Sequence, residues 1–211
     1  MSAAVDLRML LGPARDQGVR PTCLAFAMSD AHGAAHGHDG PLATDYAHYH
    51  AARREHATMN EPVSTASMRD ALEQDGQPAE VACPYGVPRA IDWTPPVGLA
   101  PLWRRASTLL KGTLPSKVLR AALAASRANV LTLLITESFY GPDAATFEVA
   151  DDASVVVGEH AVVVVAVRDG GTGVGAFYLV RNSWGPDWGV EGHAWLPQSY
   201  VDARAIDIVQ F

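Results

Sequence analysis

The sequence predicts an α+β protein with two lobes, a helical N-terminal lobe at about residues 1–105 and a β-rich C-terminal lobe at about residues 106–211. In the first lobe, apolar residues recur at helical spacing, as Met68, Ala71 and Leu72 do. In the second lobe, short runs of β-branched and aromatic residues are separated by turns. With 211 residues, of which 48% are hydrophobic and 18% charged, the chain can bury a sizeable core within a single domain.

The first lobe opens with an expected extended entry over residues 1–15. An irregular loop follows, because Pro21 and the neighbouring glycine disfavour regular structure, and Thr22 is the expected N-cap of the first helix. We predict that this helix spans residues 23–35, is buried, and ends near Gly37.

Two more helices are expected in the first lobe, over residues 45–54 and 67–74, the latter ending near Gly76. Prolines then recur through residues 78–101 and exclude regular structure over most of that span. We therefore expect a long loop that leads from the first lobe to the second.

The second lobe begins with a predicted helix over residues 115–127, since Pro115 suits the first helical position and an apolar face follows it. The remaining elements are predicted to be strands, because β-branched residues replace the helical spacing. The strand-forming runs are VLTLLIT (130–136), HAVVVVAV (160–167), AFYLVRNS (176–183), HAWLP (193–197) and AIDIV (205–209).

The charge of the chain excludes two classes of partner. Its formal net charge is −7, and no cluster of Lys and Arg is present. Nucleic acids and anionic membranes both select for such clusters. We therefore expect neither a nucleic acid nor a membrane as a partner.

Cysteine usage bears on the compartment. The only cysteines are Cys23 and Cys83, which excludes a disulfide framework and leaves one conceivable bridge. The first 22 residues contain several charged residues in place of an apolar signal core, and no apolar segment is long enough to span a membrane. We expect a cytoplasmic protein, unless it is exported by a route that the sequence does not reveal.

Cys23 would be the first residue of the first helix. A thiol at that position faces unpaired backbone N–H groups and the positive end of the helix dipole, and both favour the nucleophilic thiolate. The competing interpretation is an inert buried cysteine, which is the commoner case for a free thiol.

Two downstream residues favour the reactive interpretation. His160 precedes the apolar run of a strand, and Asn182 follows another strand in the stretch RNSWG. Each has an ordinary explanation alone, the histidine as a core residue and the asparagine as a turn former. The order Cys, His, Asn along the chain is that of a Cys-His-Asn hydrolase.

At these residues the sequence resembles the papain-like cysteine peptidases. The resemblance lies in four blocks in the order of the family: DQGVRPTCLAFA (16–27), SMRDALEQDGQPAEVACPYG (67–86), GEHAVVVVAV (158–167) and NSWGPDWGVEGHAWLP (182–197). It implies a papain-like two-lobe fold with the active site in the cleft between the lobes. The stretch VDLR (5–8) is similar to the start of a mature enzyme, so we expect no inhibitory propeptide.

The resemblance also implies the catalytic roles. Cys23 would be the nucleophile, paired as a thiolate with the imidazolium of His160, and Asn182 would orient the imidazole. Gln17 and the backbone N–H of Cys23 would form the oxyanion hole. No cofactor and no metal is implied.

For substrate binding, the resemblance implies residues on both sides of the cleft, with an apolar side chain preferred in the pocket. These residues are Ala66, Ser67, Met68, Gly158, Glu159, Ala161, Trp184 and Trp188. The two tryptophans would shield the Asn182 hydrogen bond and wall the leaving-group side. The sequence departs from the family pattern at Pro21, Thr22 and Leu24, and the paired glycines of the family are replaced around Thr65.

These features predict a cysteine endopeptidase whose partner is a protein or peptide substrate, with a regulatory partner protein as one means of control. Two alternatives stay open: an acyltransferase or amidase with the same triad, and a peptide-binding module with a blocked cleft. The sequence does not determine the oligomeric state.

His32 and His36 could share one helix face as a metal-binding pair. However, no HExxH motif accompanies them, and a solvated helix end explains the histidines equally well. No metal site is predicted.

Overall fold

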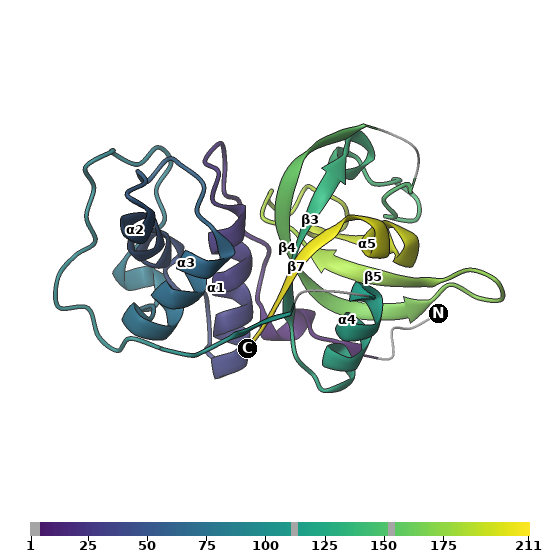
Figure 1. Ribbon diagram of the computed structural model, residues 1–211, viewed down its shortest axis with the longest axis horizontal. Helices are drawn as coiled ribbons and strands as arrows, with labels where there is room; N and C mark the ends of the chain where they lie inside the picture. The colour runs from purple at the N-terminus through teal and green to yellow at the C-terminus, as the bar shows by residue number, and fades with distance from the viewer. Residues whose placement is uncertain (1–4, 111–113, 152–154) are drawn as a thin grey trace.

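The computed structural model describes residues 5–110, 114–151 and 155–211. The first three helices of the chain form one half of the molecule, and a twisted sheet with the last two helices beside it forms the other (Figure 1). The helices are α1 (Cys23–His36), α2 (Thr44–Glu55), α3 (Thr65–Asp70), α4 (Pro115–Ala124) and α5 (Gln198–Arg204). The strands are β1 (Val5–Asp6), β2 (Thr108–Leu110), β3 (Asn129–Thr136), β4 (Val156–Asp169), β5 (Ala176–Arg181), β6 (His193–Pro197) and β7 (Ala205–Gln210). Within the described ranges, no helix is both long and apolar enough to cross a membrane.

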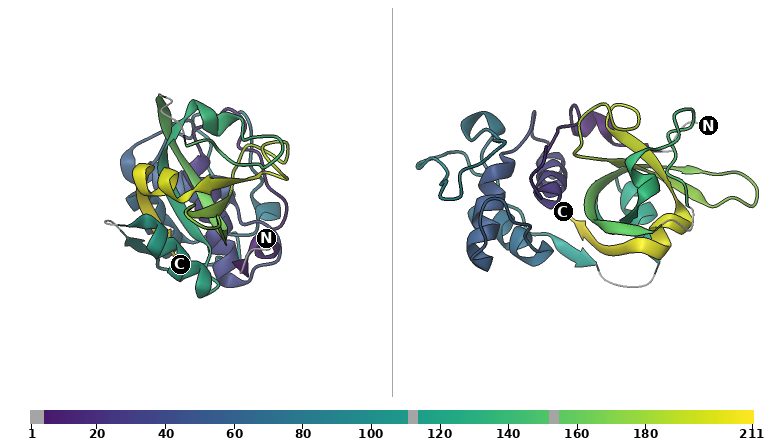
Figure 2. Two further views of the ribbon diagram at one scale, coloured as in Figure 1. Left: turned by 90° about the vertical axis from the view of Figure 1, so that its right-hand side faces the viewer. Right: turned by 90° about the horizontal axis from the view of Figure 1, so that it is seen from above.

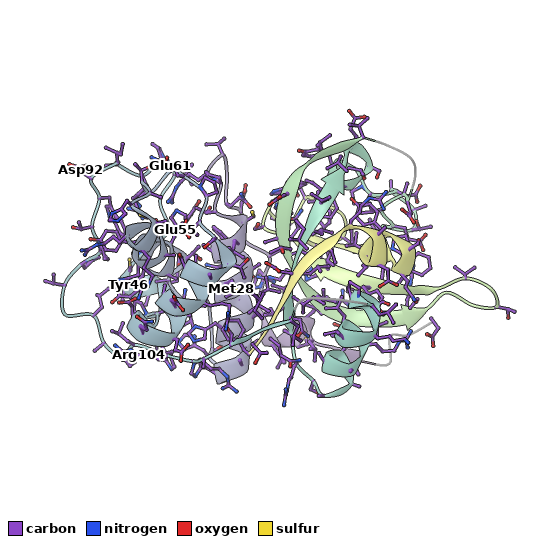
Figure 3. All side chains as sticks on the ribbon, viewed as in Figure 1. Met28, Tyr46, Glu55, Glu61, Asp92 and Arg104 are labelled. Carbon is purple, nitrogen blue, oxygen red and sulfur yellow. The ribbon has the colours of Figure 1, made fainter. Side chains whose placement is uncertain are left out.

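The helix α1 lies at the boundary between the two halves and packs on α2 on one side and on β4 on the other. Nine of its residues are buried, including Ala25, Phe26 and Met28. Met28, labelled on α1 in Figure 3, belongs to the same apolar core as residues of the sheet. The helix ends at Gly37, whose φ of 60° is a conformation that glycine adopts without a Cβ penalty. Because α1 is buried on both sides, it is a rigid support for its own N-terminus.

The helix α3 begins two residues earlier than the sequence predicts, at Thr65. The Ser64 hydroxyl accepts a hydrogen bond from the backbone N–H of Ser67 at 3.2 Å, and this cap sets the start of the helix. A π-helical turn, Ala71–Asp75, continues it to Gly76. A Cβ at Gly76 would lie 2.5 Å from the Trp103 carbonyl oxygen, so only glycine allows the long loop to return this close.

The sheet is antiparallel, with the strand order β2-β7-β3-β4-β5-β6, and β1 pairs with β4. The strand β4 is the longest, at 14 residues, and its run 160–167 is fully buried. One contiguous apolar core includes residues of α1 together with residues of β3 and β4. The strand β7 enters the sheet between β2 and β3 and carries the chain back to α1 (Figure 2). There the ring of Phe211 lies 5.4 Å from that of His32.

The α+β fold class predicted from the sequence is confirmed, and so is each predicted helix and strand within a few residues. The extended entry is wrong in part, because Arg8–Leu10 form a 3₁₀ turn, while residues 1–4 lie outside the described residues. The predicted helix over 115–127 ends earlier, at Ala124. The elements β1, β2 and α5 were not predicted, because each is too short to show a periodicity of its own.

Candidate active site

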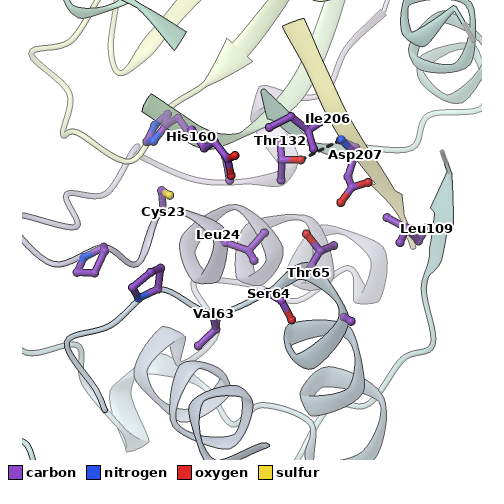
Figure 4. A pocket seen from close by; sticks show the side chains of 15 residues that line it. Cys23, Leu24, Val63, Ser64, Thr65, Leu109, Thr132, His160, Ile206 and Asp207 are labelled. Atoms are coloured by element: carbon purple, nitrogen blue, oxygen red, sulfur yellow. Dashed lines mark hydrogen bonds between the residues drawn. The ribbon is translucent and has the colours of Figure 1, made fainter. Parts of the chain in front are cut away.

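A cavity of about 400 Å³ lies beside the N-terminus of α1. Cys23 and Leu24 line it from α1, residues 62–66 line it from the loop before α3 and the first turn of α3, and residues 159–161 line it from β4. Figure 4 shows the Cys23 sulfur and the His160 ring on the same side of this cavity. The two helices and the sheet thus contribute opposite walls, as expected for a cleft between lobes.

Cys23 is the first residue of α1, as the sequence predicts, but its surroundings differ from the prediction in two ways. Thr22 lies at the N-cap position, yet its hydroxyl forms no capping hydrogen bond and instead lies 2.7 Å from the Tyr85 hydroxyl. Burial raises the pKa of the Cys23 thiol, and the hydrogen bonds from backbone N–H groups, with that of Ala161 the strongest, only partly oppose it. Burial therefore acts against the lowering of this pKa that the sequence predicts from the helix terminus.

His160 lies on β4 and is only 6% exposed. Its Nε2 lies 2.7 Å from Oδ1 of Asn182. The same Oδ1 also accepts the backbone N–H of Ser183 at 2.7 Å, which identifies it as the acceptor and His160 Nε2 as the donor. In the neutral imidazole the other nitrogen, Nδ1, is then a free base.

Burial lowers the pKa of His160 to about 4, although the hydrogen bond to Asn182 acts in the opposite direction. Burial therefore favours the neutral forms of both His160 and Cys23. The burial of both groups opposes the predicted thiolate–imidazolium pair, which stays a prediction. Proton transfer from sulfur to Nδ1 would create two opposite charges side by side, whose attraction offsets part of the cost of burial.

Aromatic rings cover the His160 imidazole. The ring of Trp184 lies 4.7 Å from it, and that of Phe139 lies 5.7 Å from it. Tyr140 stacks on Trp184 at 5.2 Å with an interplanar angle of 7°. The indole N–H of Trp188 donates to the Phe139 carbonyl oxygen at 3.0 Å. These rings keep water from the hydrogen bond between His160 and Asn182, which strengthens it.

Gln17 is buried, and both ends of its side-chain amide are held. Oε1 accepts the Ser183 hydroxyl at 2.6 Å, and Nε2 donates to the Arg20 carbonyl oxygen at 2.8 Å. The backbone N–H of Gln17 also donates to the Ser183 carbonyl oxygen, at 2.8 Å. Because an amide nitrogen has two hydrogens, Gln17 retains one N–H after its bond to Arg20.

The predicted substrate-binding residues fall into two groups. Ala66, Glu159 and Ala161 line the cavity beside Cys23. The others, Ser67, Met68, Gly158, Trp184 and Trp188, are not among its lining residues. Met68 is fully buried in the apolar core, so its prediction as a pocket residue is wrong: the cap at Ser64 starts the helix early and turns this side chain inward.

The far wall of the cavity was not predicted from the sequence. It consists of Leu109 from β2, Thr132 from β3, and Ile206 and Asp207 from β7. Thr132 and Asp207 face each other in the register of the sheet, and the Asp207 N–H donates to the Thr132 hydroxyl at 3.0 Å. Two carboxylates, those of Glu159 and Asp207, line a pocket for which the sequence predicts an apolar preference.

No protein-family model matches the chain, and no curated protein matches it. Several solved structures are similar to the chain. Xylellain, a cysteine protease from Xylella fastidiosa, is 20% identical with a TM-score of 0.78 over 98% of this chain and 84% of its own. The digestive procathepsin L 3 of Tenebrio molitor is 17% identical, with a TM-score of 0.78 over 99% of this chain and 69% of its own. The bromelain protease from Ananas comosus is 16% identical, with a TM-score of 0.75 over 99% and 98%.

Proposed function

We propose that this chain, which has the papain-like fold, is a cysteine endopeptidase that acts on protein or peptide substrates. The observation that carries the proposal is the hydrogen bond of 2.7 Å between His160 and Asn182. It leaves His160 Nδ1 as a base in the wall of the same cavity that holds the Cys23 thiol. A thiol, a base and a group that orients the base are the parts that nucleophilic catalysis requires.

In the proposed reaction, the Cys23 sulfur attacks the carbonyl carbon of the substrate while its proton passes to Nδ1 of His160. The imidazolium then protonates the leaving amine as the C–N bond breaks, which leaves a thioester on Cys23. A water molecule attacks this thioester with His160 as the general base, and the carboxylic acid and the thiol are released. Asn182 holds the imidazole in one orientation through both steps.

The negative oxygen of the tetrahedral intermediate would accept hydrogen bonds from the backbone N–H of Cys23 and the remaining Nε2–H of Gln17. One such donor is worth about 3 to 4 kcal/mol in the transition state. The Ser183 hydroxyl supports the role of Gln17, because its bond to Oε1 prevents the amide from turning its oxygen toward the negative charge.

A peptide library with mass spectrometric readout tests the proposal with the wild-type chain in reducing buffer. Cleavage products would support it, whereas ligated products would indicate an acyltransferase. Intact peptides would contradict hydrolysis and favour a binding module. The variant Cys23→Ala should abolish cleavage.

The matched control is Cys83→Ala, because Cys83 is the other free cysteine and lies in the helical half, away from the cavity. Its side chain is 1% exposed, and burial raises its pKa to about 11. Full cleavage by Cys83→Ala beside none by Cys23→Ala would assign the nucleophile.

A further inference from the structure

The two donors of the proposed oxyanion hole lie at the ends of one irregular loop. Gln17 precedes the loop, and the N–H of Cys23 follows it. Between them, Gly18 has a φ of 59° and the side chain of Val19 is 92% exposed, so the outer part of the loop packs on little. The buried Arg20 anchors the middle of the loop, and a further contact joins its two ends.

The Tyr85 hydroxyl bridges the two ends of this loop. It donates to the backbone carbonyl oxygen of Gln17 at 2.9 Å. The Thr22 hydroxyl lies 2.7 Å from the same phenol oxygen. A phenol has one proton, which Tyr85 gives to Gln17, so Thr22 must be the donor in the second bond. The chain of hydrogen bonds therefore runs in one direction, from Thr22 through Tyr85 to Gln17.

Tyr85 is itself held rigidly. The Arg20 guanidinium lies over its ring at 4.8 Å, and the edge of Phe26 meets the ring at 4.7 Å with an interplanar angle of 81°. Its backbone N–H donates to Oε1 of Glu80 at 2.7 Å. The following N–H, that of Gly86, donates to the carboxylate of Asp45 at 3.0 Å. The phenol thus connects the loop to residues that are fixed in the helical half.

We propose that the Tyr85 hydroxyl is a positioning group for the oxyanion hole, which keeps Gln17 and the N–H of Cys23 at the separation that a tetrahedral intermediate requires. Tyr85 is not among the residues that line the cavity, so it acts through Gln17 and Thr22 and not on the substrate. The inference rests on the proposed peptidase function. It extends that function to Tyr85, which lies in the block 67–86 and to which the sequence assigns no role.

The variant Tyr85→Phe removes the hydroxyl and keeps the ring between Arg20 and Phe26. Displacing an oxyanion donor should lower kcat by less than removing it, which lowers kcat by roughly 100-fold to 1,000-fold. We expect kcat to fall about tenfold with KM unchanged, because only the transition state uses the hole.

A peptide nitrile provides a second readout. When the Cys23 S–H adds across the C≡N bond, sulfur bonds to carbon and the proton goes to nitrogen, which then occupies the place of the oxyanion. The affinity of Tyr85→Phe for the nitrile should fall by the same factor as kcat. Alkylation of Cys23 by iodoacetamide makes no use of the hole and should stay within about twofold of wild type.

The matched control is Tyr178→Phe. Tyr178 is buried in the sheet, and its hydroxyl also donates to a backbone carbonyl oxygen, that of Ser116 on α4, at 2.7 Å and away from the cavity. This variant should lose stability but neither kcat nor nitrile affinity. If Tyr85→Phe does not fold, Thr22→Val reports on the other bond of the same chain, and if both fold, their effects should be less than additive.

Several results would overturn the inference: unchanged kcat and nitrile affinity in Tyr85→Phe, a parallel loss of alkylation, or strict additivity with Thr22→Val. Failure of the proposed function looks different, since wild-type protein would then leave all peptides intact. The nitrile measurement needs only Cys23 as a nucleophile, so it would still test Tyr85. A wild-type chain inert toward both reagents would overturn both proposals.

Discussion

Arg181 and Asp30 join the two halves of the molecule through an ion pair of 2.7 Å between Nε and Oδ2. Asp30 lies on α1, and Arg181 ends β5 directly before Asn182. The guanidinium also donates to the carbonyl oxygens of Gly12 and Pro13, each at 2.6 Å. The backbone that carries Asn182 is therefore tied to the helix that carries Cys23.

Replacing this carboxylate should destabilise the protein strongly. Asp30 also pairs with Arg15 at 2.7 Å. Asp30→Ala therefore leaves Arg181, whose side chain is only 1% exposed, without its carboxylate partner, and leaves Arg15 only its longer pair with Glu80 at 3.5 Å. Removing one partner of a buried ion pair lowers the free energy of unfolding by about 3 to 5 kcal/mol. Urea denaturation should show this loss. The exposed pair between Arg120 and Asp169 is the control, and Asp169→Asn should cost less than about 1 kcal/mol. Equal losses in the two variants would contradict the interpretation.

Iodoacetamide should modify Cys23 and spare Cys83 in the folded protein. Cys83 is 1% exposed and its pKa is raised to about 11 by burial, followed by the charges of Asp45 and Glu80, so few thiolates exist there near neutral pH. Cys23 lines an open cavity beside a base. Peptide mass mapping after a brief reaction measures both sites. Early modification of Cys83 would count against this assignment.

Asn182→Ala and His160→Ala should differ in severity. His160→Ala removes the general base and acid, a contribution of about 100-fold to 10,000-fold. Asn182→Ala removes only the bond that orients the ring, and the adjacent Trp184 ring, 4.7 Å away, still confines it, so we expect a loss of about tenfold. Steady-state kcat/KM on one peptide compares the two. A larger loss in Asn182→Ala would mean that the amide does more than orient the ring.

Stability should fall as the solution becomes acidic. Burial lowers the pKa of His32, His48 and His193 to about 4, below the value near 6.5 of the unfolded chain. Between these two pH values the unfolded chain binds more protons than the folded chain. Each of these histidines therefore lowers the free energy of unfolding by about 1.4 kcal/mol for each pH unit that the pH falls. Urea midpoints at about pH 7 and about pH 5 measure this loss.

The fully buried His48 allows a direct test of that pH dependence. The variant His48→Leu should lose less stability than wild type between the two pH values, because it has one titrating group fewer. The exposed His56 is the control, and His56→Asn should follow the wild-type dependence. If both variants behave like wild type, the acid sensitivity arises elsewhere.

The fold was predictable because two signals agreed: helical spacing that gives way to β-rich runs, and four blocks in the order of one family. The papain-like fold predicted on that basis is confirmed by the solved structures. Local patterns could not give the wall formed by Leu109 and Asp207, because it depends on β7 pairing with both β2 and β3. The register between two strands that are far apart in the sequence cannot be inferred from either strand alone.

The candidate site was predictable as a set of residues but not in its electrostatics. The motifs identify Cys23, His160, Asn182 and Gln17 as candidates, and the hydrogen bonds of the last three agree with the roles proposed for them. The sequence argument for Cys23 considered the helix terminus, an effect of about 0.3 to 1 kcal/mol near the surface. Burial raises the pKa of this thiol, in the opposite direction, and burial depends on the packing of both halves.

The position of β7 has a consequence for how the protein is made. Ile206 and Asp207 complete the wall of a cavity whose thiol lies at residue 23. Chains are synthesised from the N-terminus, so α1 can form long before β7 leaves the ribosome. Until then β2 has no neighbour, since β7 is the strand that joins it to the sheet. A ribosome-bound chain therefore carries the sulfur without the complete pocket until β7 has been made and has paired with β2.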